Sequence, residues 1–180
     1  MAGELQFRVA TVDDAEPLRQ LIEAAFRAED SREGWVDNLG LGAAFRLKLD
    51  VVLGIINDAD SDMLMAFDND GTLLGTVTVA HKGPGRGRII FLAIQKEHQQ
   101  GGLGRKILAH AEDYGQQRWG ITRFGLNALS ARTLLISWYT RRGYAKTGET
   151  TPFPRDALPD SVAPEDLYFV EMEKIVGPES

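Results

Sequence analysis

The chain has 180 residues, of which 43% are hydrophobic and 26% charged, and its formal net charge is −6. This composition is that of an ordinary soluble globular protein. The negative charge comes without a basic stripe, which argues against a nucleic-acid partner. The absence of cysteine excludes disulfides, thiolate metal ligands and a covalent acyl-cysteine intermediate.

Targeting and metal signals are also missing from the sequence. No apolar run approaches the roughly 20 residues that span a bilayer, and the N-terminal segment lacks the apolar region of a signal peptide. We therefore expect a cytoplasmic protein with no membrane partner. The three histidines, His81, His98 and His110, do not have the spacing of metal ligands, so no metal is expected.

The N-terminal half combines strand and helix patterns. A capping signal at Thr11–Asp14 precedes apolar residues at helical spacing, and Asn69-Asp70-Gly71 is typical of a hairpin turn. The expected elements are a strand at 5–10, a helix through residues 15–26, an irregular loop at 30–44, a helix at about 45–57, and strands at 63–67 and 73–81.

The C-terminal half continues the alternation. We expect a hairpin at 83–87, a strand at 88–94, a helix from 103 to about 119, a strand at 123–128, a helix at 131–142, a strand at 144–150, a polar loop at 155–165 and a strand at 167–174. Gly143 is expected to end its helix as the left-handed C′ residue. This order, without repeats or a linker, predicts one α/β (α+β) domain over residues 1–180, with a mixed sheet and helices on both faces.

Residues 99–105, QQGGLGR, lie between an apolar strand and an amphipathic helix. Clustered glycines let backbone N–H groups converge, and a helix N-terminus adds unpaired N–H groups and partial positive charge. The segment therefore predicts a phosphate or pyrophosphate site. It is not a Walker A loop, because Arg105 and Lys106 follow Gly104, nor a dinucleotide fingerprint, because position 107 is Ile. An ordinary glycine turn is the alternative.

The pattern Gln99-x-x-Gly102-x-Gly104, together with the element order, resembles the acetyl-CoA loop of the GNAT (GCN5-related N-acetyltransferase) superfamily. The resemblance implies a mostly antiparallel sheet of six to seven strands whose fourth and fifth strands splay apart. It implies acetyl-CoA as the co-substrate, with strand backbone contacting pantetheine and the loop holding the pyrophosphate. The cofactor-binding residues implied are Leu92, Ile94, Gln99, Gln100, Gly101, Gly102, Leu103, Gly104, Arg105 and Tyr139.

A second match is the segment YTRRGY at residues 139–144, which resembles the family's Tyr-x-x-x-Gly-Phe motif. The resemblance implies that Tyr139 protonates the leaving thiolate. A phenol with a pKa of about 10 is a competent proton donor at neutral pH. The alternative is that Tyr139 is a core aromatic beside Trp138. Further segments, such as Ser130-x-Arg132, resemble an uncharacterised subgroup and leave the acceptor open.

The acceptor side is predicted less directly. Glu29 and Glu149 are candidate general bases, acting through water, although an isolated Glu is more often a surface residue. Arg132 is expected to bind an acceptor carboxylate or to hold Glu149. Trp35 and Phe153 are candidate apolar walls and equally candidate loop anchors.

The predicted function is direct transfer of an acetyl group from acetyl-CoA to a primary amine of a small molecule, amino acid derivative or peptide. The alternative is a non-catalytic acyl-CoA-binding or sensing module of the same fold. A homodimer is expected by analogy with the fold.

Overall fold

The computed structural model describes residues 4–30, 46–99, 101–152 and 167–176, with side chains described for all of these except 27–30. Their elements are β1 (Gln6–Val9), the short helix η1 (Val12–Asp14), α1 (Ala15–Asp30), α3 (Leu49–Ile56), β2 (Ser61–Phe67), β3 (Leu73–His81), β4 (Arg86–Ile94), the short helix η2 (Lys96–His98), α4 (Leu103–Trp119), β5 (Arg123–Leu129), α5 (Thr133–Arg141), β6 (Ala145–Pro152) and β7 (Tyr168–Ile175). The predicted α+β class is confirmed.

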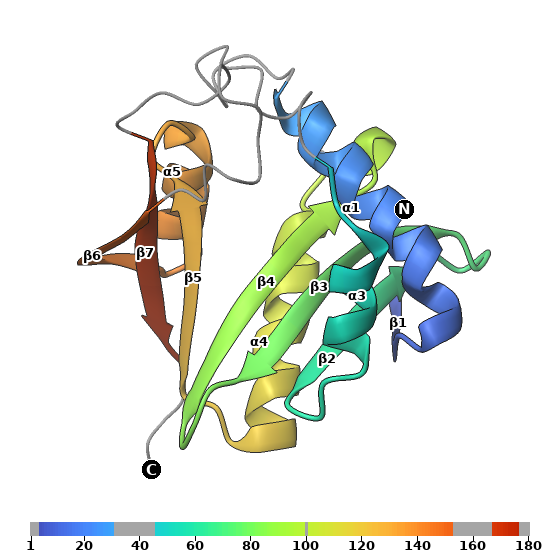
Figure 1. The fold of residues 1–180 in the computed structure, drawn as a ribbon, viewed down its shortest axis with the longest axis horizontal. Helices are drawn as coiled ribbons and strands as arrows, with labels where there is room; N and C mark the ends of the chain where they lie inside the picture. Colours follow the sequence, from blue (N-terminus) through green and yellow to red (C-terminus); the bar gives the residue numbers. More distant parts are fainter. Residues whose placement is uncertain (1–3, 31–45, 100, 153–166, 177–180) are drawn as a thin grey trace.

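The strands of this described part form one seven-stranded sheet in the order β1-β2-β3-β4-β5-β7-β6. All neighbouring strands are antiparallel except β4 and β5, which pair in parallel through only three residue pairs, Arg86–Arg123, Gly87–Phe124 and Arg88–Gly125. Beyond these pairs the two strands diverge into a V that is narrow at the bottom and wide at the top of Figure 1. The predicted mixed sheet with a splayed pair is confirmed.

A bulge in β4 lies just beyond its last pair with β5. The pairing register between β3 and β4 shifts between Thr76 and Thr78, and the opposing Phe91 has a φ of +53°. A large residue rarely adopts positive φ, and a bulge bends its strand and re-aims its side chains. The distortion therefore coincides with the region where β4 and β5 separate.

Two hydrophobic cores cover the two faces of the sheet. On β2, Leu64 packs in a core with Ile107 of α4 and Ile136 of α5, whereas Met63 packs in a core with Leu18 of α1. Alternate strand residues point to opposite faces, so α1 and α3 cover one face and α4 and α5 the other. Figure 1 shows the same layers, with α1 and α3 in front of the sheet and α4 behind it.

Two helices begin later than predicted. The predicted helix at 45–57 is α3, which starts at Leu49, because the N–H of Leu47 donates to Glu23 Oε2 of α1 at 2.8 Å and Lys48 keeps an extended backbone. The predicted helix at 131–142 is α5, which starts at Thr133, because Arg132 is its non-helical N-cap residue.

Two strand ends and one short helix also differ from the expectation. The strand β6 continues to Pro152, a residue tolerated here because β6 is an edge strand. The strand β4 starts at Arg86, within the predicted hairpin. The short helix η2 was not predicted.

Two predicted helix-end signals are confirmed. The N–H of Thr11 donates to the Asp14 carboxylate at 2.8 Å ahead of α1. At the end of α5, Gly143 has a φ of +101°, its N–H donates to Thr140 O at 3.0 Å, and the N–H of Tyr144 donates to Tyr139 O at 3.1 Å. This pair of bonds is a Schellman motif, and it turns the chain so that Tyr144 enters the core.

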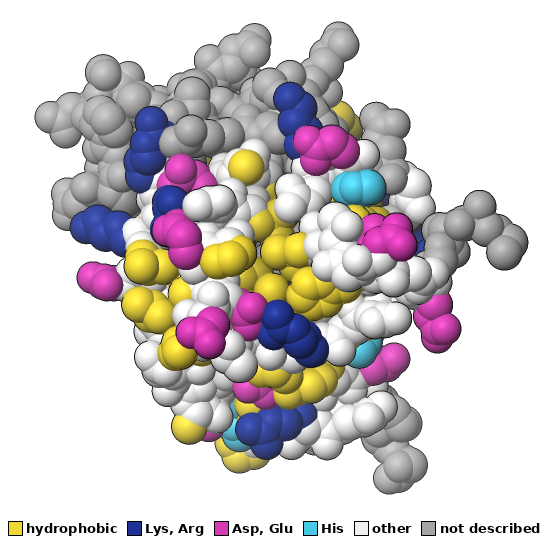
Figure 2. Space-filling view, turned by 90° about the vertical axis from the view of Figure 1, so that its right-hand side faces the viewer, with side chains coloured by type: hydrophobic (Ala, Val, Ile, Leu, Met, Phe, Trp, Pro, Cys, Tyr) yellow, Lys and Arg dark blue, Asp and Glu magenta, His cyan; other side chains and the backbone are white. Residues whose placement is uncertain are grey.

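The edge strand β1 contacts α4 through one aromatic pair. Phe7 of β1 stacks on His110 of α4 with ring centroids 3.6 Å apart and planes 8° from parallel. Figure 2 looks at this side of the molecule and shows hydrophobic side chains gathered in the middle of the face. No helix in the described ranges is both long and apolar enough to cross a membrane.

Candidate active site

The predicted phosphate loop forms the N-terminus of α4. Gly101 and Gly102 have φ values of +100° and +82°, which L residues with a side chain rarely adopt. The first intrahelical bond runs from Lys106 N–H to Gly102 O at 3.2 Å, so the N–H groups of Leu103, Gly104 and Arg105 have no intrahelical acceptor. These groups and the helix dipole favour an anion at this position.

The side chain of Arg105 adds positive charge to the loop. Its Nη2 lies 3.7 Å from the position of a Cβ on Gly102, whereas a Cβ on Gly101 would meet nothing within 4 Å. The loop is therefore open on the Gly101 side and flanked by a guanidinium on the other. This arrangement fits a pyrophosphate, which carries negative charge and needs several hydrogen-bond donors.

Gln99 connects this loop to the end of β4. Its side-chain Nε2 donates to Ile94 O at 3.2 Å, so the amide group holds the loop against the last residue of the strand. Gln99 thus has a structural contact in addition to the cofactor contact expected of it. Gln100 lies outside the described residues.

The edge of β4 that faces the V offers backbone hydrogen-bonding groups. The N–H of Gln95 donates to Leu74 O of β3 at 2.8 Å. Because the direction of backbone groups alternates along a strand, the N–H groups of Ile94 and Leu92 point away from β3, toward the gap between β4 and β5. This geometry suits the backbone contacts expected of both residues.

The helix α5 packs on the first turn of α4 through Trp138. Two atoms of the Trp138 ring lie 3.5 and 3.8 Å from the position of a Cβ on Gly104. Tyr139 is 7% exposed and belongs to the same hydrophobic core as Ile94, with Leu92 and Leu103 packed against that core. The structure therefore brings the β4 end, the start of α4 and Tyr139 together.

The ring of Tyr139 is held between two other aromatic rings. It meets Trp138 edge-on with centroids 5.3 Å apart and Tyr144 edge-on with centroids 5.9 Å apart. Such edge-to-face pairs fix ring orientation and stabilise by about 0.5–1.5 kcal/mol each. The position of the Tyr139 phenol is thus fixed by packing.

A buried polar cluster behind Tyr139 was not predicted from the sequence. The hydroxyl of Tyr144 donates to Glu112 Oε2 at 2.8 Å, and Lys174 Nζ lies 2.9 Å from Glu112 Oε1. Burial, followed by the negative charge of Glu112, raises the pKa of Tyr144 well above its usual range, so its hydroxyl stays protonated. Glu112 lies four residues after the buried Leu108, a spacing that places it on the inner face of α4.

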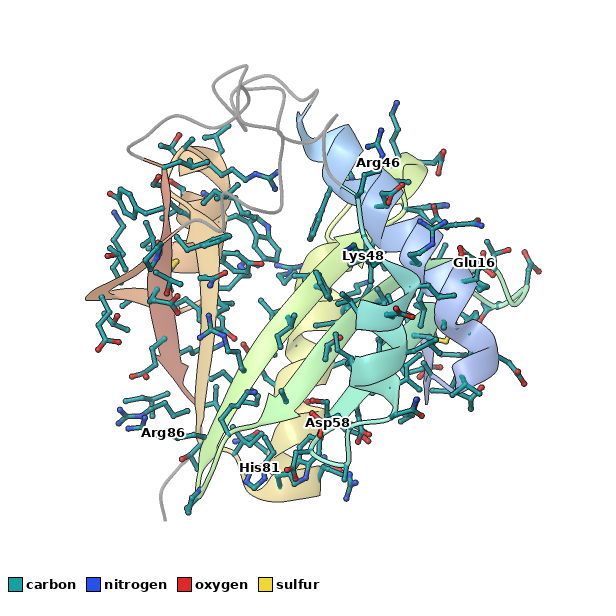
Figure 3. All side chains as sticks on the ribbon, in the orientation of Figure 1. Glu16, Arg46, Lys48, Asp58, His81 and Arg86 are labelled. Carbon is teal, nitrogen blue, oxygen red and sulfur yellow. The ribbon has the colours of Figure 1, made fainter. Side chains whose placement is uncertain are left out.

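Arg132 lies at the wide end of the V, between α5 and α1. Its guanidinium carbon is 6.0 Å from the ring centroid of Phe26, and that ring is 6.2 Å from the ring of Phe91 at the β4 bulge. Arg132 is 8% exposed. Figure 3 shows Arg46 at the same wide end, beside α1, and Arg86 at the narrow end.

The remaining predicted acceptor residues near α1 are only partly described. Glu29 lies in α1 one turn after Phe26, but its side chain is outside the described residues. Trp35 and Phe153 also lie outside them. Arg132 and this end of α1 therefore meet at the wide end of the V, whereas Glu149 has different neighbours.

Glu149 borders a polar pocket, here named the Glu171 pocket. Its volume is about 570 Å³ and its lining residues are Arg88, Asn127, Glu149, Thr150, Thr151 and Glu171. Glu149 enters it from a bulge in β6, where Gly148 has a φ of +94° and the pairing register with β7 shifts between Lys146 and Thr150. Sequence reasoning found Glu149 but none of the other five residues.

Glu171 is the central residue of this pocket. It accepts hydrogen bonds from Arg88 Nη2 at 2.9 Å, Asn127 Nδ2 at 3.1 Å and Thr151 Oγ1 at 2.5 Å. Burial alone raises the pKa of Glu171, but the three hydrogen bonds outweigh burial and hold the pKa below its usual range. The carboxylate therefore stays ionised and links β4, β5, β6 and β7 where the V begins.

Comparison with known proteins agrees with this geometry. Residues 16–144 match the profile of the Acetyltransferase (GNAT) family. No curated protein sequence matches the chain. The PaiA N-acetyltransferase from Thermoplasma acidophilum, solved with coenzyme A, is 17% identical with a TM-score of 0.68, and the match covers 96% of this chain and 99% of that one.

Two further solved structures are similar. The ribosomal-protein-S18-alanine N-acetyltransferase from Escherichia coli is 13% identical with a TM-score of 0.71, covering 98% of this chain and 97% of that one. A spermidine N-acetyltransferase from Vibrio cholerae, solved with CoA and spermine, is 14% identical with a TM-score of 0.69, covering 95% of each chain. These likenesses support the fold, and the match over residues 16–144 shows that the chain belongs to the GNAT acetyltransferase family.

Proposed function

We propose that the protein transfers an acetyl group from acetyl-CoA directly to a primary amine of a small molecule, amino acid derivative or peptide. The observation that carries the proposal is the meeting of an anion-binding helix N-terminus and an unpaired strand edge at the V. The amides of residues 103–105 begin α4, and β4 loses its β5 partner beyond Arg88. The structural neighbours solved with coenzyme A lend support.

Donor binding rests mainly on backbone groups. The pyrophosphate binds to the N–H groups of Leu103, Gly104 and Arg105 and to the Arg105 guanidinium. The backbone of Leu92 and Ile94 is to pair with the pantetheine amides, as one strand pairs with another. Gln99 keeps these two parts in register through its bond to Ile94 O.

Acetyl-CoA supplies an activated thioester whose carbonyl oxygen becomes negative as the amine attacks. We assign the hydrogen bond to that oxygen to an N–H directed to the V, near Ile94, and such a donor typically contributes on the order of a hundredfold in rate. Tyr139, fixed between two rings, donates a proton to the departing thiolate. The sulfur then leaves as a thiol, and the acetyl group remains on nitrogen as an amide.

The acceptor has to lose a proton before it attacks, because alkylamines are mostly protonated at neutral pH. We propose that water passes this proton to a carboxylate, for which the chain offers Glu29 and Glu149. Arg132, with Trp35 and Phe153, forms the acceptor's other contacts. On this basis kcat/KM rises with pH as the free amine becomes more abundant.

The test of the proposal is a pair of measurements on the full chain. Calorimetric titration with acetyl-CoA should give micromolar affinity, and ATP and NAD should bind much more weakly. Release of CoA thiol should then depend on an added amine. Binding of acetyl-CoA without thiol release from any amine would contradict the transferase and favour an acyl-CoA-binding module.

A further inference from the structure

The Glu171 pocket contains none of the residues assigned to the acetyl donor, and it borders the narrow end of the V through Arg88 of β4 and Asn127 of β5. We infer that this pocket is a recognition subsite for a second ammonium group on the acceptor, separated by several ångströms from the amine that is acetylated. The inference rests on the proposed transferase function and names the acceptor class.

The charge of the pocket favours a cation. Arg88 and Glu171 are paired at 2.9 Å and neutralise each other. Asn127, Thr150 and Thr151 are neutral and offer hydrogen-bonding groups. The charge that remains is the carboxylate of Glu149, which is exposed on the pocket rim. An ammonium group would find there a charge-assisted partner and nearby hydroxyl and amide oxygens.

The pocket opens on the sheet face opposite α4. Its inner residues Asn127 and Glu171 alternate along β5 and β7 with Leu126, Ala128, Val170 and Met172, which pack in the core beneath α4. Since alternate strand residues face opposite sides, the pocket lies on the face of α1 and α3. An acceptor bound there approaches the V from the side opposite the pyrophosphate loop.

Strand register gives the distance that such an acceptor must span. Arg88 forms the last residue pair with β5, and the β4 bulge at Phe91 follows three residues later. At about 3.3 Å per residue, the pocket floor and the bulge are roughly 10 Å apart along the strand. Glu149 lies on β6, across β5 and β7 from β4, so within a series of four to eight methylenes the longer diamines are expected to reach both points.

The β6 bulge is the device that brings Glu149 to the pocket. Between the pairs Lys146–Met172 and Thr150–Val170, β6 advances four residues while β7 advances two. Gly148 provides the left-handed turn, and the N–H of Glu149 donates to Thr147 Oγ1 at 3.1 Å. Bulges of this kind redirect side chains beside functional sites. The role that follows for Glu149 is recognition, which leaves the acceptor's proton to water and Glu29.

The test compares α,ω-diamines of four to eight methylenes with n-alkylamines of the same lengths as acceptors. The reaction rate is measured from the release of CoA thiol. The wild-type protein should favour the best diamine over its alkylamine by about tenfold in kcat/KM, the size of one charge-assisted hydrogen bond. Glu149→Gln should bring the ratio of kcat/KM for diamines to kcat/KM for alkylamines close to one, through a higher KM for the diamines. Glu149→Lys should reverse the preference and favour ω-amino acids, whose second group is a carboxylate.

The matched control is Glu173→Gln. Glu173 also lies on this face of β7 and loses the same charge, but it pairs with Arg123 at 3.2 Å and is not among the pocket residues. Its diamine preference should equal that of the wild type. If Glu149→Gln and Glu173→Gln lost the diamine preference to a similar extent, the effect would be due to net charge, and the subsite would be overturned.

Two other outcomes would overturn the inference while leaving the transferase intact. One is equal use of diamines and alkylamines by the wild type. The other is an equal fall in kcat for both series in Glu149→Gln, which would make Glu149 a base. If no amine causes release of CoA thiol, the proposed transferase function is wrong. Calorimetric titration of the CoA complex with the same diamines then tests whether the subsite binds a second ammonium group. Weaker diamine binding by Glu149→Gln than by the wild type would support the subsite. Equal binding by the two proteins, or no detectable binding by the wild type, would overturn the subsite.

Discussion

The proposed donor side and the proposed acceptor side of the V are built from different parts of the chain. The donor side uses backbone amides and glycines from one continuous stretch, from the end of β4 to the first turn of α4. The Glu171 pocket uses side chains from four strands that are far apart in the sequence, β4, β5, β6 and β7. Backbone sites depend on chain conformation, whereas side-chain sites depend on which strands become neighbours.

This difference separates affinity for the donor from choice of the acceptor. A backbone site binds any molecule with the right phosphate and amide groups, and it changes little when exposed side chains change. A side-chain site can be altered one residue at a time. Substitutions on the two sides should therefore affect different constants, and the following variants test that separation.

The largest expected effect is on the donor side, at Gly104. Gly104→Asp places a carboxylate among the N–H groups that receive the pyrophosphate, so the Kd for acetyl-CoA should rise at least a hundredfold through charge repulsion. Gly104→Ala is the matched control, because its Cβ meets Trp138 and Ile94 at ordinary distances of 3.5–3.9 Å. Calorimetric titration and thermal unfolding of both variants measure the effect. Equal affinity in a folded Gly104→Asp protein would refute the site.

The next effect is on the chemical step, at Tyr139. Tyr139→Phe keeps both ring contacts and removes only the hydroxyl. If that hydroxyl protonates the thiolate, kcat should fall by roughly ten- to a thousandfold while the Kd for acetyl-CoA stays constant. Steady-state rates and calorimetry on the same preparation measure both constants. A fully active variant would show that the thiolate leaves without this proton.

The smallest effect is on stability, at Glu171 on the acceptor side. Glu171→Gln weakens three hydrogen bonds to a charged group and should lower the free energy of unfolding by about 1–3 kcal/mol at neutral pH. The folded pKa of Glu171 lies below its ordinary value of 4.5, so the unfolded chain takes up the proton first. The contribution of ionised Glu171 to the free energy of unfolding is thus fully present above the ordinary pKa. It is lost as the pH falls through the folded pKa.

The pH series provides the control for this prediction. Denaturant titrations from pH 7 downward should show the difference between wild type and Glu171→Gln shrinking in acid. Glu173→Gln, which alters a more exposed pair with Arg123, should show little difference at any pH. A difference for Glu171→Gln that stays constant with pH would assign the loss to packing rather than to charge.

Much of the fold was predictable because hydrophobic spacing and turn residues act locally. The glycine that ends α5, the capping residues before α1 and the order of strands all depend on neighbours a few positions away. The start of α3 was wrong by several residues because a distant side chain, Glu23, fixes the backbone at Leu47. Sequence spacing contains no information about such a contact.

The candidate site divides in the same way. Glycines and a helix start pointed to the donor loop in the sequence, and Tyr139 followed from the resemblance of residues 139–144 to the GNAT Tyr-x-x-x-Gly-Phe motif. Glu171 and Asn127 were missed because single polar residues within strands resemble ordinary surface positions. Only the pairing of β5 with β7, which matches Asn127 with Glu171, brings them together. The contact between Arg132 and Phe26 likewise depends on how α1 packs over the sheet.

The edge position of β6 has a consequence for how this chain can tolerate sequence change. A strand with a single neighbour can gain or lose loop residues without disturbing other pairings, and the extra residues around Gly148 lie on such a strand. All eight positions of β6 are exposed, so mutations there cost little core packing. If β6 contributes to the proposed acceptor subsite, substitutions on this strand can change acceptor choice without disturbing the proposed donor loop at the start of α4.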